Sequence, residues 1–118
     1  MSRRILVVDD ELAVCRAMSW ELKGFELEVV TTLSDALAAL SREQFDAVVC
    51  DWNLNDACGE RVLQVAAKLN RKARRFIVSA IVPDSLGPML SSGLAHRYIA
   101  KPWRPHDVRD AVREELHV

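Results

Sequence analysis

Four short apolar runs in the 118-residue chain each lead into polar residues that can take part in chemistry. These polar residues are Asp9 and Asp10, Asp51, Ser79 and Lys101. Continuous apolar runs of this length predict strands that are buried on both faces of a parallel sheet. Ligands of open α/β sheets bind at the carboxyl ends of the strands, so the four endings predict one shared site, with Asp51 exposed at its strand end.

The stretches between these runs have the apolar spacing of amphipathic helices. We expect helices at about 11–23, 32–42, 59–69 and 105–116. Thr32 with Asp35 suits a helix start, Gly24 suits a left-handed residue after the first helix, and Pro105 suits the first turn of the last helix. The expected strands are 4–8, 27–31, 47–50, 76–78 and 98–100.

The region after Ser79 is the least regular part of the chain. Pro83, Gly87 and Pro88 fall where a fourth helix is expected. Proline lacks a backbone donor and its ring clashes with the preceding turn of a helix. We therefore expect this helix to be short, to start late or to be distorted around Pro88, and the region to be mobile.

Composition and charge narrow the class of protein. Half of the residues are hydrophobic and the net charge is -1, which excludes a disordered chain and gives no electrostatic reason to expect nucleic acid or membrane binding. The basic run from Lys68 to Arg75 is expected to be a solvated loop at the far end of the sheet. Residues 1–118 are expected to form a single domain, since strands and helices alternate throughout.

The cysteines and the lengths of the apolar runs bear on location. Cys15, Cys50 and Cys58 are odd in number and lack metal-ligand spacing, so we expect free thiols in a reducing compartment. The run Ile5 to Val8 is too short for a signal-peptide core, and no segment approaches a membrane-spanning length. We expect a soluble, cytoplasmic protein.

The polar residues at the strand ends form a set that suits phosphoryl transfer. Three carboxylates held close together, from Asp9, Asp10 and Asp51, repel one another unless a cation is present. Mg²⁺ prefers such oxygen ligands and usually retains waters and phosphate oxygens. Asp51 could act as nucleophile, while the ammonium of Lys101 and the hydroxyl of Ser79 could contact phosphoryl oxygens.

Along essentially its whole length, the chain resembles the receiver domain of two-component response regulators, on the residues described above. Gly59 also falls where this family has a loop glycine, and Tyr98 stands three residues before Lys101. The resemblance implies a flavodoxin-like, doubly wound, five-stranded parallel sheet of order 2-1-3-4-5 with five helices. It also implies a domain that switches between states and does not turn over a substrate.

The resemblance further implies roles for individual residues. Asp9, Asp10 and Asp51, with the backbone carbonyl of Asn53, would bind Mg²⁺. Asp51 would accept a phosphoryl group from a histidine kinase or a phosphotransfer protein. Ser79 and Tyr98 would be the switch residues, Lys101 would contact the phosphoryl group, and the Lys101-Pro102 bond would be cis. The output domain or partner is left open.

Some residues depart from the family pattern, and two other functions are considered. Asn55 stands where receivers commonly have a proline after the phosphorylated aspartate. Trp103, which follows Lys101-Pro102, resembles a sequence variant found in some receivers. One alternative is a receiver-like module that binds partners without phosphate, through the region of the fourth helix. Another is a Mg²⁺-dependent phosphohydrolase, although such enzymes usually carry a second acid two residues after the nucleophile, where this chain has Asn53.

Overall fold

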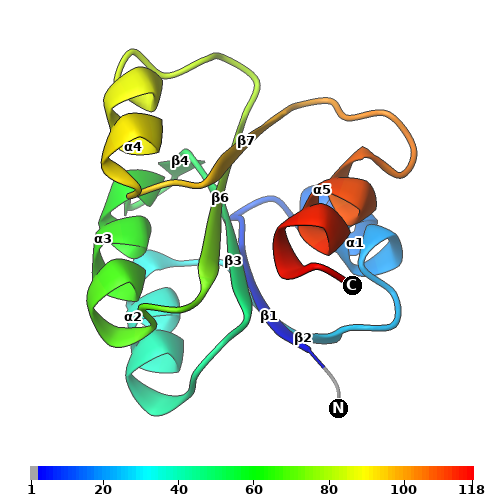
Figure 1. The fold of residues 1–118 in the computed structure, drawn as a ribbon, viewed down its shortest axis with the longest axis horizontal. Coiled ribbons are helices and arrows are strands. Elements are labelled where there is room, and N and C mark those ends of the chain that lie inside the picture. The colour runs from blue at the N-terminus through cyan, green and yellow to red at the C-terminus, as the bar shows by residue number, and fades with distance from the viewer. Residues whose placement is uncertain (1–2) are drawn as a thin grey trace.

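A five-stranded parallel sheet forms the centre of the computed structural model, which describes residues 3–118. The strands are β1 (Arg4–Val8), β2 (Glu26–Val30), β3 (Ala47–Asp51), β6 (Arg74–Ser79) and β7 (Arg97–Ala100). They lie in the order β2-β1-β3-β6-β7 (Figure 1). Numbered along the chain within this sheet, that order is 2-1-3-4-5, so the predicted flavodoxin-like topology is confirmed.

Helices cover both faces of the sheet. They are α1 (Leu12–Glu21), α2 (Leu33–Arg42), α3 (Gly59–Leu69), α4 (Leu86–Ser92) and α5 (Asp107–Leu116). Figure 1 shows α1 and α5 on one side of the sheet and α2, α3 and α4 on the other, which confirms the doubly wound α/β fold. None of the helices in the described part of the chain is long and apolar enough to cross a membrane.

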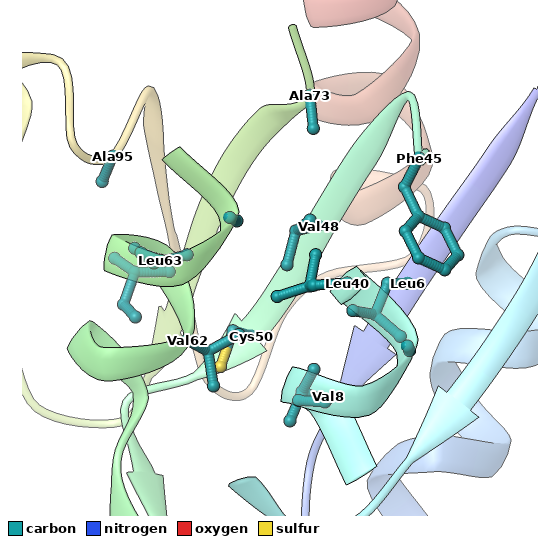
Figure 2. Packing of buried hydrophobic residues seen from close by; sticks show 14 of the residues in the cluster. Leu6, Val8, Leu40, Phe45, Val48, Cys50, Val62, Leu63, Ala73 and Ala95 are labelled. Atoms are coloured by element: carbon teal, nitrogen blue, oxygen red, sulfur yellow. The ribbon is translucent and has the colours of Figure 1, made fainter. Parts of the chain in front are cut away.

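The core consists of two layers because successive side chains of a strand point to opposite faces. Leu6 and Val8 of β1 face the side of α2 and α3, while Ile5 and Val7 face the side of α1 and α5. Figure 2 shows the first layer, in which Cys50 of β3 lies among apolar side chains. Complete burial of one large apolar side chain stabilises the fold by roughly 1.5–3 kcal/mol, which explains why the central strands are continuously apolar.

Two sequence signals for helix ends are confirmed, one at the start of α2 and one after the end of α1. The side chain of Thr32 accepts a hydrogen bond from the backbone N–H of Asp35 at 3.1 Å and caps α2. Gly24 has a φ of 103°, in the left-handed region that favours glycine. α1 is shorter than expected, because Leu22 already adopts a non-helical cap conformation.

The expected place of Pro105 in the last helix is wrong. α5 begins at Asp107, after a turn in which the backbone N–H of Arg104 donates to the Asp107 carboxylate at 2.9 Å. His106 between them has a φ of 74°, which is incompatible with a right-handed helix. Pro105 therefore belongs to the turn that leads into α5.

α4 is short and starts late, as expected. Its seven residues begin at Leu86, so Pro88 lies in the first turn, where its missing N–H would have had no helical partner. Gly93, with a φ of 80°, ends the helix. The mobility of this region stays a prediction.

A small hairpin that the sequence did not predict follows β3. β4 (Asn53–Leu54) and β5 (Ala57–Cys58) pair antiparallel across Asn55 and Asp56. Asparagine and aspartate suit such tight turns because their short side chains can hydrogen-bond nearby backbone groups. Asn55 thus occupies the first position of a two-residue turn.

The basic run lies in two different environments. Arg71 and Lys72 are exposed in the loop after α3, as expected, whereas Lys68 is exposed on the last turn of α3 itself. Arg75, however, is only 7% exposed, so the expectation of a solvated side chain is wrong for this residue. The reason is that Arg75 lies on β6, a strand paired on both sides, with its side chain beneath the loop that follows α4.

Candidate functional site

The polar residues predicted to share a site do lie together at the carboxyl edge of the sheet. Asp9 follows β1, Asp51 closes β3, Ser79 closes β6 and Lys101 follows β7. A pocket of about 380 Å³ opens there. Its lining residues are Asp10, Glu11, Asp51, Asn53, Leu54, Asn55, Ser79, Ala80, Ile81 and Lys101.

Asp51 is buried, which corrects the expectation of an exposed carboxylate. The residue is 6% exposed, because β3 is a central strand paired with β1 and β6 and the β4–β5 hairpin follows it directly. Burial raises the pKa of the Asp51 carboxyl, and the charge of Asp9 adds to this effect, while Lys101 opposes it. Keeping the Asp51 carboxylate ionised in this buried position therefore costs free energy.

Lys101 bridges the two buried carboxylates. Its Nζ atom lies 3.0 Å from Oδ2 of Asp9 and 3.3 Å from Oδ1 of Asp51. Burial alone would lower the pKa of the lysine, but hydrogen bonds and the charges of Asp9 and Asp51 outweigh burial and raise it. The ammonium thus stays charged, at a position next to the Asp51 oxygen where a new negative charge would be stabilised.

Four carboxylates form a cluster at this edge of the sheet, and three of them lie near Lys101. Asp9, Asp10, Glu11 and Asp51 each offer an oxygen, and these oxygens all lie within 4.8 Å of one another. One Asp9 oxygen accepts the backbone N–H of Glu11 at 2.9 Å, which fixes the start of the acidic turn. One ammonium cannot balance this charge, and an all-oxygen set of this kind fits a hard divalent cation such as Mg²⁺.

The acidic group contains one residue that sequence reasoning did not assign. This residue is Glu11, and its position directly after Asp10 is the signal that could have placed it in the site. Its carboxylate also lies 3.8 Å from Nζ of Lys101. Asn53, whose backbone carbonyl was expected to be a metal ligand, lines the same pocket.

The Ser79 hydroxyl is engaged by the loop that follows it. It donates to the backbone carbonyl of Ile81 at 2.6 Å and accepts the backbone N–H of Ile81 at 3.2 Å. Ser79 is 3% exposed, and Ile81 is 78% exposed. The hydroxyl therefore holds a loop that presents an apolar side chain to solvent beside the pocket.

Tyr98 lies on the edge strand β7 and is turned toward the same point. Its hydroxyl donates to the backbone carbonyl of Ser79 at 2.8 Å. The backbone N–H of Lys101 donates to that carbonyl as well, at 3.0 Å. The Lys101-Pro102 peptide bond is cis, as the resemblance implied.

Gly59 is required by a close approach of two backbone segments. A Cβ atom built on it would lie 2.1 Å from the backbone oxygen of Asp51, far inside any real contact. Its N–H also donates to the carbonyl of Trp52 at 2.7 Å. The start of α3 is thus packed directly against the residue at the centre of the site.

Comparisons with known proteins identify the family and the fold of this chain. The model of the response regulator receiver domain matches residues 5–113. The receiver domain protein (CheY-like) from Methanospirillum hungatei is 28% identical, with a TM-score of 0.91, over 99% of this chain and 95% of that one. The structure of the receiver domain of DrrB activated with BeF3 is 24% identical, with a TM-score of 0.88, over the whole of both chains. The fold is therefore shared along the full length.

Curated relatives are much longer proteins. The hydrogenase transcriptional regulatory protein HoxA of Bradyrhizobium diazoefficiens is 30% identical over 97% of this chain and 24% of its own length. The alginate biosynthesis transcriptional regulatory protein AlgB of Pseudomonas aeruginosa is 32% identical over 98% of this chain and 26% of its own length. This chain thus spans about a quarter of their length. Since the family model covers nearly all of it, the chain belongs to the receiver domains of two-component response regulators.

Proposed function

We propose that Asp51 accepts a phosphoryl group from a phosphohistidine of a histidine kinase or a phosphotransfer protein. The observation that carries this proposal is the placement of the Asp51 carboxylate, 3.3 Å from the ammonium of Lys101 and at the edge of a pocket of about 380 Å³. The pocket is open to solvent on the side of Asn55 and Ile81, which are both exposed, so a donor side chain can enter there.

The chemistry is an in-line displacement at phosphorus. A carboxylate oxygen of Asp51 forms a bond to phosphorus as the phosphorus–nitrogen bond of the phosphohistidine breaks. The electron pair of that bond returns to the imidazole nitrogen, and with a proton on its other ring nitrogen the histidine leaves as a neutral imidazole. The product is an aspartyl phosphate, whose added charge Lys101 is positioned to stabilise.

Mg²⁺ would be held by Asp9, Asp10 and Asp51 together with the backbone carbonyl of Asn53, and the nearby carboxylate of Glu11 adds to the negative field. The fit rests on the four carboxylate oxygens gathered within 4.8 Å of one another. When bound, the ion offsets their mutual repulsion and the charge of the incoming phosphoryl oxygens. Lys101 keeps its contact with Asp9 as the second source of positive charge.

Phosphorylation would act as a switch through Ser79. Its hydroxyl now donates to Ile81, and an aspartyl phosphate nearby offers a charged acceptor that makes a stronger hydrogen bond. Exchange of partners would release the loop after β6, and Tyr98 would report the change at β7. The domain therefore shifts between two populated states and does not turn over a substrate, apart from slow attack of water on its own aspartyl phosphate.

The output and the location are inferred from coarser observations. Relatives named as transcriptional regulatory proteins are about two to four times as long as this chain, so we infer that the signal passes to an output module or to a partner protein. The net charge of -1 gives the domain no electrostatic reason to contact nucleic acid itself. The free thiols of Cys15, Cys50 and Cys58 suit a cytoplasmic location.

The experiment is incubation with Mg²⁺ and a small phosphodonor such as acetyl phosphate or phosphoramidate, followed by intact-protein mass measurement. We expect one phosphoryl adduct on the wild type and none on Asp51→Asn. Asp56→Asn is the matched control, since Asp56 is an exposed carboxylate in the same segment and should leave the adduct unchanged. A wild type without adduct would contradict the proposal and favour a phosphate-independent binding module, whereas rapid multiple turnover would favour a phosphohydrolase.

A further inference from the structure

Arg75 is a buried cation without a carboxylate partner among the described residues. Burial lowers the pKa of its guanidinium, and the charge of Arg74 adds to this effect. A buried charge is costly unless it is hydrogen-bonded. Arg75 is therefore a residue whose presence in the interior needs a compensating set of contacts.

Those contacts are backbone carbonyls. Nε of Arg75 donates to Leu94 at 2.9 Å and Nη2 donates to Gly93 at 3.0 Å. Nη1 donates to Ala73 at 3.0 Å and to Arg71 at 3.4 Å. Because charged donors make stronger hydrogen bonds than neutral ones, the guanidinium ties the start of β6 to the segment that ends α4.

The backbone of Arg75 strengthens the same connection. Its N–H donates to Nδ1 of His96 at 2.9 Å, and its carbonyl accepts the N–H of His96 at 2.7 Å. Gly93 and Leu94 stand where the helix dipole places partial negative charge, which favours a cation there. The C-terminal end of α4 and the start of β7 are thus fixed to one residue of β6.

Among residues 3–118, no charged side chain anchors the N-terminal end of α4 in this way. Ser85 makes no side-chain cap hydrogen bond, and Pro88 has no N–H to contribute to the first turn. The loop before the helix exposes Val82 to 59% and Ile81 to 78%. This loop is also the one that the Ser79 hydroxyl holds through Ile81.

We propose that Arg75 is an anchor that confines the phosphorylation-dependent movement of α4 to residues 80–88. The inference rests on the proposed function, because release of Ile81 by Ser79 is what would start the movement. With Gly93 and Leu94 held by the guanidinium, the loop and the first turn of α4 move, while residues 92–96 stay in place. The surface that changes is then the exposed apolar loop beside the pocket.

The test is backbone hydrogen exchange, read by mass, with and without the phosphodonor and with Mg²⁺ present throughout. In the wild type, we expect exchange to change in peptides covering 80–88 and to stay the same in peptides covering 92–96. In Arg75→Met, we expect exchange in 92–96 to become about tenfold faster or more and to respond to phosphorylation, since the partly buried carbonyls of Gly93 and Leu94 lose a charged donor. Arg71→Met, an exposed arginine four residues away, should behave as the wild type.

Several outcomes separate the anchor from the chemistry. Equal changes in 80–88 and 92–96 of the phosphorylated wild type would overturn the anchor, and this result does not depend on whether Arg75→Met folds. Arg75→Lys, which keeps the charge with fewer donors, should give an intermediate pattern. Absence of the adduct by intact mass would instead contradict the proposed function, and the anchor with it.

Discussion

The hydroxyl of Tyr98 donates a hydrogen bond to the backbone carbonyl of Ser79 at 2.8 Å. This bond joins an aromatic residue of the edge strand to the residue whose own hydroxyl holds the loop beside the pocket. The orientation of the Tyr98 ring is therefore fixed by its hydrogen bond to the backbone of Ser79. A change at Ser79 can reach the surface of β7 through this contact.

Replacement of Tyr98 by Phe tests how much this contact contributes. The ring packing remains, so we expect the free energy of unfolding to fall by only about 1 kcal/mol, the net value of one hydrogen bond. The adduct on Asp51 should form as in the wild type, since the hydroxyl donates to the backbone carbonyl of Ser79 and not to the carboxylates of the site. Urea unfolding and intact mass measure the two quantities. Loss of the adduct in Tyr98→Phe would show that the hydroxyl takes part in the chemistry.

Replacement of Gly59 by Ala should be severely destabilising. The new Cβ would lie 2.1 Å from the Asp51 oxygen, and neither backbone segment can yield without displacing β3 or α3. We expect a loss of about 3 kcal/mol or more in urea unfolding, within the range of strained and overpacked sites, together with loss of the adduct.

Gly87→Ala is the matched control for this substitution. Gly87 lies in α4, and a Cβ atom there meets nothing within 4 Å. Alanine should therefore leave stability unchanged or raise it by up to about 1 kcal/mol, through its higher helix propensity. If both glycine variants lost the same stability, the close approach at Gly59 would not be the cause.

The elements that the sequence predicted well depend on local signals. Thr32 and Asp35 form a cap within one turn of the helix. Gly24 adopts a left-handed conformation, which glycine favours because it has no side chain. The strand order and the shared edge followed from the resemblance and from the rule that parallel strands end together. These features need no knowledge of which distant segments pack on them.

The errors concern residues whose environment is set by distant segments. Asp51 is buried because neighbouring strands and a hairpin enclose it, and Arg75 because the end of α4 lies over its side chain. The two-residue strands around Asn55 are too short to have a recognisable period. Pro105 fits a first helical turn by composition, but the left-handed His106 excludes it from α5.

The Asp51 carboxylate should cost the folded domain stability when no divalent cation is present. Burial and Asp9 raise its pKa above the ordinary value of 3.8, so the folded state binds a proton more tightly than the unfolded state does. The ionised carboxylate therefore destabilises the fold at pH values above the raised pKa. We expect Asp51→Asn to unfold at a higher temperature than the wild type at pH 7 in the presence of EDTA.

The same reasoning sets a limit on this gain. Below pH 3.8, wild-type Asp51 is protonated in both states, so the difference from Asp51→Asn should disappear. Asp84→Asn, a change at an exposed carboxylate of the β6–α4 loop, is the control and should leave the midpoint near that of the wild type. A lower midpoint for Asp51→Asn at pH 7 would mean that the contact with Lys101 outweighs the cost of burial.

His96 should make the stability of the domain depend on pH. Its Nδ1 accepts the backbone N–H of Arg75 at 2.9 Å, which requires the neutral ring. Burial lowers the pKa of His96 from 6.5 to about 4, with Arg74 and Arg75 adding to the effect and Glu115 opposing it. Between pH 6.5 and about 4, the unfolded chain binds a proton that the folded domain does not, so stability falls as the pH falls through this window.

Replacement of His96 by Asn removes this dependence while retaining an acceptor for the Arg75 N–H. Urea unfolding of both proteins at intervals from pH 7.5 to 4 should give a flatter profile for His96→Asn, because its side chain does not titrate. His117→Asn, at the exposed end of α5, is the matched histidine control and should keep the wild-type slope. Equal slopes for His96→Asn and the wild type would contradict this prediction. The loss of stability in acid would then come from the carboxylates, and protonation of His96 would not weaken its hydrogen bond with the Arg75 N–H.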